Sequence, residues 1–137
     1  MKERMKWAFI IDKDEFVRLS LNKILKKYGF ETEELEDLSQ LEGRKKEIEG
    51  GMILADVEVE DLERGSLFVR KWNDRFILMT PVVTDEFALR LKEYGIRHIL
   101  KKPVEPKLLK RVVQKISFPD EDENPLSGRK REGSRSK

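Results

Sequence analysis

The chain has 137 residues, a length typical of one domain, with 38% apolar and 41% charged residues. It contains no Cys and one His, which excludes disulfides, thiolate metal sites and His-rich metal cages. No apolar run reaches 18 residues, so we expect no membrane span. The apolar N-terminal stretch ends at Asp12, with no cleavage site before it, so we expect no signal peptide and a cytoplasmic location.

Opposite charges nearly cancel in this chain. The net charge is +2, from 29 basic and 27 acidic residues, so we expect no strong field of one sign over the whole molecule. Asn and Gln together number only five, and abundant Glu, Lys and Arg with few amides is the composition reported for hyperthermophile proteins. We therefore expect a thermophilic source.

The composition changes near residue 118, where the apolar pattern stops. Residues 119–137 hold one large apolar residue, an acidic block and a basic end. Such a segment cannot offset the entropy cost of ordering by burial. We predict a folded domain over residues 1–118 and a disordered charged tail over 119–137. The tail is too short and too polar for an output domain, so we expect a stand-alone module that binds nucleic acid only if the basic end does so.

Apolar runs and helical spacings alternate along residues 1–118. In chain order they predict a strand at 7–11, a helix at 16–25 ended by Gly29, a weak strand at 30–34, a polar helix at 38–48, a strand at 52–55, a short helix at 67–72, a strand at 76–79, a helix at 87–94 ended by Gly95, a strand at 96–100 and a helix at 108–116. Continuous apolar strands separated by helices indicate buried parallel strands. The predicted fold is an α/β doubly wound parallel sheet with helices on both faces.

Four polar residues follow or end four of the predicted strands: Asp12, Asp56, Thr80 and Lys102. In a doubly wound sheet, ligands bind at the carboxyl ends of the strands, so these side chains are expected to converge. An Asp carboxylate can attack phosphorus, while an ammonium and a hydroxyl can bind the transferred oxygens. The pattern therefore indicates phosphoryl transfer.

The segments IIDKDEFVRLSLNKIL, MILADV, FILMT and ILKKP resemble, in order, the signature segments of the response-regulator receiver domain of two-component signalling. The resemblance covers residues 5–117 and implies a flavodoxin-like five-stranded sheet in the order 2-1-3-4-5. It also implies phosphotransfer from the phospho-histidine of a sensor kinase to Asp56. In the same way, Asp12 matches the first acid, Thr80 the switch hydroxyl and Lys102 the phosphate-binding lysine.

The chain departs from the family pattern at the acidic pocket. Lys13 stands where the family has the second acid, which coordinates Mg²⁺. If Asp12 and Asp56 bind the metal ion, they do so against repulsion from the Lys13 ammonium. Lys13 would pair with Asp56 in place of the metal, and Glu58 would supply a carboxylate or bond Lys102. Ile99 stands at the aromatic switch position, which weakens the expected coupling between hydroxyl and aromatic.

Function is then expected to lie in protein contacts and not in enzymatic turnover. The family's partner face, formed by its fourth helix, fifth strand and fifth helix, would here include Phe87, Leu91, Tyr94 and Ile99, if these are exposed. A phosphate-independent pseudo-receiver adaptor stays open as the alternative. In that case Asp12 and Asp56 would be only ion-pair partners of the nearby lysines.

A haloacid-dehalogenase-like phosphatase is the rival from another class. Asp12 would then be the nucleophile and Asp14 the general acid, with LMT and a downstream Lys completing the motif set. The scheme lacks a further acidic pair on a later strand to hold Mg²⁺. The simpler reading of Asp14 is a helix N-cap, because Asp is favoured there.

Overall fold

The computed structural model describes residues 6–118, and the chain divides after Pro106 into two compact units. The first unit contains a five-stranded sheet of the order β2-β1-β3-β4-β5, in which all four strand pairs are parallel. The strands are β1 (Lys6–Ile11), β2 (Phe30–Leu35), β3 (Met52–Ala55), β4 (Phe76–Thr80) and β5 (His98–Lys101). The predicted fold class and the strand order implied by the resemblance are both confirmed.

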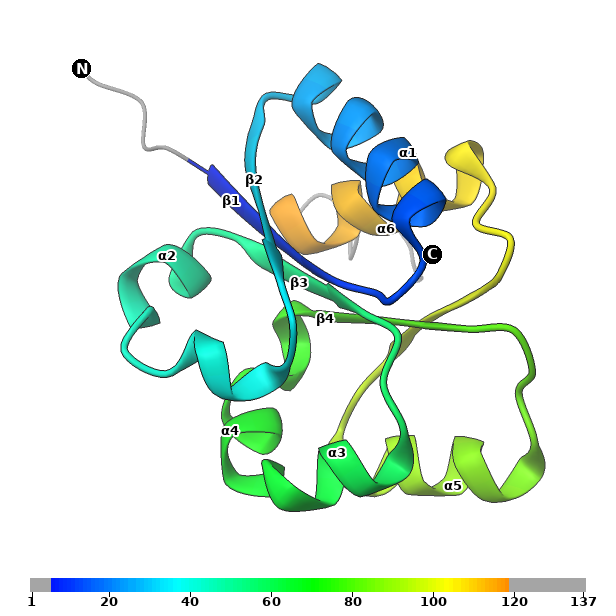
Figure 1. Cartoon of the computed structure of the whole chain (residues 1–137). Coiled ribbons are helices and arrows are strands. Elements are labelled where there is room, and N and C mark those ends of the chain that lie inside the picture. Colours follow the sequence, from blue (N-terminus) through cyan, green and yellow to red (C-terminus); the bar gives the residue numbers. More distant parts are fainter. Residues whose placement is uncertain (1–5, 119–137) are drawn as a thin grey trace, which may run out of the picture. The chain divides into compact units, whose positions relative to one another are not determined.

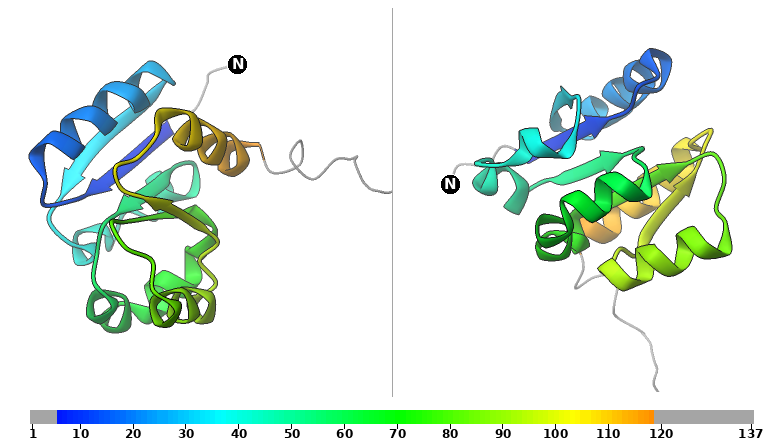
Figure 2. Two further views of the ribbon diagram at one scale, coloured as in Figure 1. Left: turned by 90° about the vertical axis from the view of Figure 1, so that its right-hand side faces the viewer. Right: turned by 60° about the horizontal axis from the view of Figure 1, so that its bottom comes forward.

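Helices lie on both faces of this sheet. In Figures 1 and 2, α1 lies on one face, and α3, α4 and α5 lie on the opposite face. The helices of the first unit are α1 (Glu15–Lys27), α2 (Lys45–Glu49), α3 (Val59–Arg64), α4 (Ser66–Lys71) and α5 (Asp85–Tyr94), with the 3₁₀ turns η1 (Leu38–Leu41) and η2 (Asn73–Arg75). In the part of the chain that the structure describes, no helix has the length and apolar character needed to cross a membrane.

The central strands β1, β3 and β4 are buried on both faces, which explains their continuous apolar runs. Successive side chains of a strand point to opposite faces, so each central strand supplies two layers. One layer packs with the helices α2 to α5 and includes Phe9, Ile11, Ile53, Ala55, Phe76 and Leu78. Residues between them are equally buried, among them Ala8, Ile10, Leu54 and Ile77. Because the central strands have no solvated face, polar residues appear only where each strand ends.

The predicted helix over 38–48 is wrong in one respect. The structure has the short 3₁₀ turn η1 and the five-residue helix α2, separated by residues 42–44. Gly43 between them has φ of +81°, a left-handed conformation that a helix cannot continue through. The apolar residues Leu38, Leu41 and Ile48 are still buried, as their helical spacing indicated.

The segment before residue 67 also differs from the prediction. The sequence predicted one short helix at 67–72, whereas the structure has α3 and α4 in succession. Helix α3 is short and acidic, and Leu62 is its only buried residue, so its apolar pattern was too sparse to detect. Glu58 is its N-cap residue, and the Glu58 N–H donates to Asp61 Oδ2 at 3.0 Å.

Two residues of the expected partner face are not exposed. Leu91 is fully buried and Tyr94 is 6% exposed, and both belong to the core between the sheet and its helices. Phe87 and Ile99 are partly buried against the same core. The spacing of Phe87, Leu91 and Tyr94 reflects the side of α5 that packs against the core. The prediction that Leu91 and Tyr94 belong to an exposed partner face is therefore wrong. The exposed apolar residue of α5 is Leu89, at 63%.

The second unit contains α6 (Pro106–Ser117) from Lys107 onward. Its buried residues are Leu109, Val113 and Ile116, spaced four and three residues apart, which confirms the predicted amphipathic helix. The predicted disordered tail over 119–137 lies outside the described residues, so the domain boundary at 118 stays a prediction.

Candidate functional site at the strand ends

Backbone pairing places the predicted site residues side by side at one edge of the sheet. The Asp56 N–H donates to the Ile11 carbonyl at 2.8 Å, which brings the end of β3 next to Asp12. In the same way, the Lys102 N–H donates to the Thr80 carbonyl at 2.8 Å. Parallel register thus aligns all four strand ends, as the sequence predicted.

One ammonium joins the two carboxylates. Lys102 Nζ lies 2.8 Å from Asp12 Oδ2 and 2.6 Å from Asp56 Oδ2. The Asp12 side chain is only 2% exposed, whereas those of Lys102 and Asp56 are 15% and 30% exposed. Burial alone would lower the pKa of the Lys102 ammonium, but its hydrogen bonds to Asp12 and Asp56 outweigh this and raise that pKa. Lys102 therefore stays charged at neutral pH.

Asp12 is held from several directions. Its Oδ1 accepts the Asp14 N–H at 2.8 Å, so both of its carboxylate oxygens have protein donors. Its backbone carbonyl accepts Arg18 Nη1 at 2.7 Å, and Arg18 is in turn paired with Glu34 on β2. Arg18 was not identified as a site residue from the sequence. The only indication in the sequence was its position, one turn into the helix that follows Asp12.

Asp14 is the N-cap of α1, as predicted. Its carboxylate accepts the N–H groups of Phe16 at 2.9 Å and Val17 at 3.4 Å. This use of the side chain is what α1 requires at its first turn, where backbone N–H groups have no partner within the helix. The general-acid role that a dehalogenase-like scheme would give Asp14 therefore has no support in the geometry.

Thr80 lies at the site but does not bond to the carboxylates. Its hydroxyl donates to the Val82 carbonyl at 2.9 Å, two residues along the chain. The residue is 9% exposed and sits at the end of β4. The hydroxyl is thus tied to the loop that leads into α5.

Lys13 and Glu58 do not make the contacts expected of them. The structure pairs Asp56 with Lys102 and not with Lys13, which is exposed and has no carboxylate of residues 6–118 within ion-pair distance. Glu58 is also exposed, and the Lys102 ammonium donates its hydrogen bonds to Asp12 and Asp56 instead. Local structure explains why these contacts are not made: Glu58 is the N-cap residue of α3, and Lys13 lies in the bend between β1 and α1.

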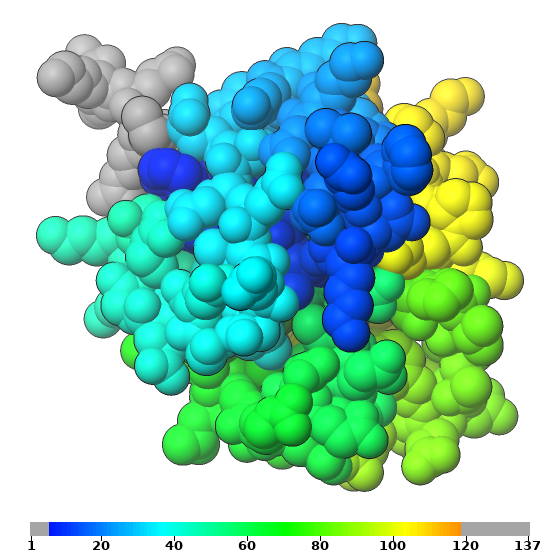
Figure 3. Space-filling view, viewed as in Figure 1, coloured from blue at the N-terminus to red at the C-terminus, as the bar shows by residue number. Residues whose placement is uncertain are grey.

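A cavity of about 550 Å³, which we call the strand-end cavity, opens beside these groups. Its walls come from the segments that follow β1, β2 and β3, which meet on the face shown in Figure 3. Its lining residues are Ile11, Asp12, Lys13, Arg18, Glu34, Leu35, Glu36, Asp37, Leu38, Asp56, Val57 and Asp61. The volume lies in the range of small-ligand sites. The Asp56 carboxylate therefore lines a cavity that is large enough for a small ligand.

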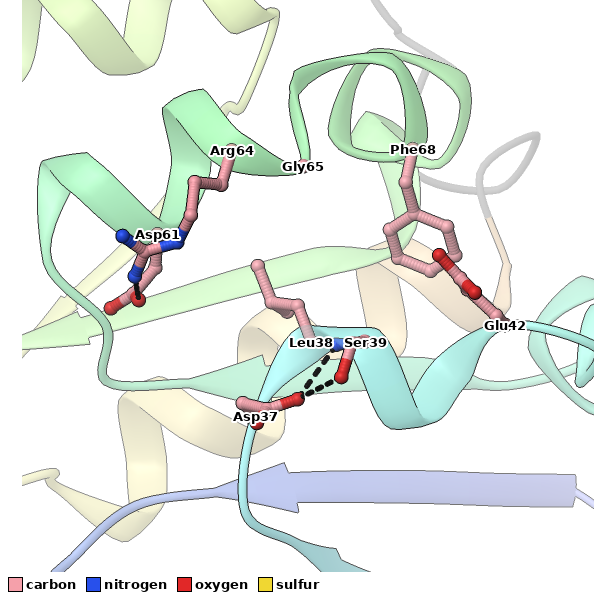
Figure 4. Close-up of a pocket in the computed structure, with 8 residues that line it drawn as sticks. All are labelled: Asp37, Leu38, Ser39, Glu42, Asp61, Arg64, Gly65 and Phe68. Atoms are coloured by element: carbon pink, nitrogen blue, oxygen red, sulfur yellow. Dashed lines mark hydrogen bonds and ion pairs between the residues drawn. The ribbon is translucent and has the colours of Figure 1, made fainter.

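A second cavity, of about 300 Å³, shares part of this wall (Figure 4). Its charged groups are largely engaged with one another, because Arg64 Nη2 lies 2.6 Å from Asp61 Oδ1 and the Ser39 N–H donates to Asp37 Oδ1 at 2.9 Å. The Ser39 hydroxyl also donates to Asp37 Oδ1, and this side-chain hydrogen bond is the main cause that lowers the pKa of the Asp37 carboxyl. This cavity therefore extends the acidic wall but adds no reactive group.

The site does not fit a dedicated divalent cation. Mg²⁺ prefers several oxygen ligands at near-octahedral geometry. Residues 6–118 contain no cluster of three or more acidic or His side chains placed to share a metal ion. Asp12 has both oxygens engaged, and Lys13 lines the same cavity as a cation. The two carboxylates that the sequence proposed as metal ligands, Asp12 and Asp56, are instead neutralised by Lys102.

Comparison with solved structures shows the same fold in response regulators. A response regulator from Thermotoga maritima is 16% identical, with a TM-score of 0.68 over 83% of this chain and 98% of that one. A two-component response regulator from Clostridium difficile is 19% identical, with a TM-score of 0.67 over 82% and 95%. Vibrio cholerae chemotaxis protein CheY4 is 20% identical, with a TM-score of 0.64 over 82% and 99%.

The sequence itself was also compared with curated proteins and with family models. No curated protein matches it. The model of the response regulator receiver domain matches residues 8–114, a range that holds most of β1, the other four strands and all four strand-end residues. The chain therefore belongs to the response regulator receiver domain family.

Proposed function

We propose that this receiver domain accepts a phosphoryl group on Asp56 from the phospho-histidine of a sensor kinase in the cytoplasm. The observation that supports this most directly is the Lys102 ammonium, bonded to both Asp12 and Asp56 beside an accessible cavity. The domain would act as a switch that holds the phosphoryl group and not as an enzyme that turns over a substrate.

Each strand-end residue has a defined part in the transfer. A carboxylate oxygen of Asp56 attacks phosphorus, an O–P bond forms, and the bond to the donor breaks with its electron pair leaving on the donor. Lys102, already 2.6 Å from the attacking carboxylate, binds the oxygens of the transferred group. Asp12 keeps Lys102 charged and in place.

The signal would leave the site through the loop after β4. After transfer, the Thr80 hydroxyl would donate to the phosphoryl group and release the Val82 carbonyl that it now bonds. Val82 and Val83 are 63% and 44% exposed, so a change in this loop alters a surface that a partner protein can contact. The mechanism needs no aromatic side chain in β5, which agrees with Ile99 at that position.

The direct test is intact mass spectrometry after incubation with acetyl phosphate. We expect one phosphoryl adduct on the wild type and none on Asp56→Asn, with Asp74→Asn, an exposed acid of η2, as the matched control that keeps the adduct. A wild-type protein that gains no adduct would refute the proposal. The phosphate-independent adaptor would then be the remaining function for the fold.

A further inference from the structure

Lys13 is a cation at the strand-end cavity that no carboxylate of residues 6–118 neutralises. It is exposed, lines the cavity together with Asp12 and Asp56, and forms no ion pair within residues 6–118. The nearby Lys102 and Arg18 differ, because each is bonded to acidic groups or a carbonyl. The charge of Lys13 is thus available to a group that enters the cavity.

The formal charges around Asp56 show what kind of group that is. Most of the acids that line the cavity already have a cation: Lys102 is bonded to Asp12 and Asp56, Arg18 is paired with Glu34, and Arg64 is paired with Asp61. Glu36 and Asp37 add negative charge to the wall, and Lys13 is the lining cation that has no such partner among residues 6–118. A divalent cation that enters this cavity is repelled by the Lys13 ammonium. A phosphoryl donor, which is an anion, is attracted by the Lys13 ammonium.

We propose that Lys13 supplies the positive charge that phosphoryl transfer to Asp56 requires, so that the transfer proceeds without a divalent metal ion. The inference rests on the proposed function. With acetyl phosphate, the Asp56 oxygen forms the new bond to phosphorus and acetate leaves with the electron pair of the broken O–P bond, so no proton is needed. Lys13 has a flexible four-carbon stem, which lets its ammonium follow the transferred oxygens.

The burial of the neighbouring residues supports this assignment. Asp12 has both oxygens occupied and its side chain is 2% exposed, so it cannot turn toward a metal without losing two hydrogen bonds. Asp56 keeps one carboxylate oxygen without a hydrogen bond from any group of residues 6–118, and its side chain is 30% exposed. Asp56 and Lys13, whose ammonium has no ion-pair partner among residues 6–118, therefore line the same cavity.

The experiment measures initial rates of adduct formation from acetyl phosphate in EDTA and in Mg²⁺, by intact mass. We expect wild-type rates in the two buffers to agree within about threefold and Lys13→Ala to lose at least about tenfold in EDTA, or about 1.4 kcal/mol of barrier. Lys23→Ala removes an exposed α1 lysine that does not line the cavity, and it should behave as wild type. Lys13→Asp should label only in Mg²⁺.

Three results would overturn the inference, and they separate it from the proposed function. Labelling of wild-type Asp56 that requires Mg²⁺, or Lys13→Ala labelled in EDTA as fast as wild type, removes the role of Lys13 but keeps Asp56 as acceptor. No adduct in any variant or buffer removes both. Calorimetric titration with Mg²⁺ gives a second readout: Lys13→Asp should bind the ion more tightly than wild type, by about tenfold or more.

Discussion

Removing the Lys102 ammonium should destabilise the fold through the carboxylates that it leaves behind. The Lys102→Met substitution keeps a similar unbranched side chain but removes the only positive charge bonded to the Asp12 carboxylate within residues 6–118. The Asp12 side chain is 2% exposed, so water cannot replace the lost partner. A buried carboxylate without a cation is costly, and Asp56 nearby adds like-charge repulsion.

The expected loss follows from the burial of the three groups. Breaking a fully buried ion pair by removing one partner costs about 3–5 kcal/mol. Lys102 and Asp56 are 15% and 30% exposed, so water screens part of the remaining charge and we expect about 2–3 kcal/mol. Adding Asp12→Asn to Lys102→Met removes the buried charge while keeping an oxygen for the Asp14 N–H, and it should restore more than half of the loss.

Urea unfolding followed by tryptophan fluorescence measures these free energies. A loss of 2–3 kcal/mol corresponds to a midpoint shift of roughly 1 M or more. The reasoning fails if Lys102→Met costs less than about 0.5 kcal/mol, or if the double variant is as unstable as the single one. The second outcome would mean that the stem of Lys102, and not its charge, stabilises the site.

Three further predictions concern pH and packing. The raised pKa of Lys102 means that its contribution to stability is complete below pH 10.5 and is lost as pH rises through the folded-state pKa; unfolding of Lys102→Met should lack this alkaline loss. The pKa of Glu33 is lowered chiefly by its hydrogen bond to Arg44, so Glu33→Gln should cost about 0.5–1 kcal/mol at pH 7, and this difference should be lost as pH falls from 4.5 through the lower folded-state pKa. By urea unfolding, Leu91→Ala should cost about 2–5 kcal/mol and Leu89→Ala less than about 0.5.

Much of the sheet could be predicted because its physics is local. Strands buried on both faces leave continuous apolar runs in the sequence. The helices α1 and α5 are followed by Gly29 and Gly95, with φ of +92° and +82°, a conformation that favours glycine and so marks the helix ends in the sequence. The order of the strands is different, since it depends on pairing between distant segments, and it came from the resemblance to receiver domains. Local pattern and family resemblance together were enough to place the carboxyl edge.

The helices between β2 and β4 were less predictable, for two physical reasons. Gly43 interrupts an otherwise helical spacing, and whether a single glycine ends a helix depends on the tertiary packing on either side of it. In α3 only Leu62 is buried, so this helix contacts the core through one residue and lacks the repeated apolar positions by which an amphipathic helix is identified in a sequence. The burial of Leu91 and Tyr94 shows the converse, because an apolar stripe on a helix indicates the core before it indicates a partner.

In the candidate site, Asp12 and Lys102 are held by their mutual ion pair, whereas Lys13 is exposed and has no bonded partner among residues 6–118. The sequence alone could not distinguish these two kinds of group. Convergence of strand ends predicted that Asp12, Asp56 and Lys102 would meet, but not which lysine would bridge the acids. Lys102 follows the end of β5 by one residue and reaches across, whereas Lys13 begins a turn and stays in solvent. Asp12 and Lys102 already neutralise each other. The negative charge that phosphorylation would add at Asp56 must therefore be balanced by a cation that is still free to move. Of the groups lining the cavity, Lys13 is the cation without a bonded partner among residues 6–118, so the balance depends on it.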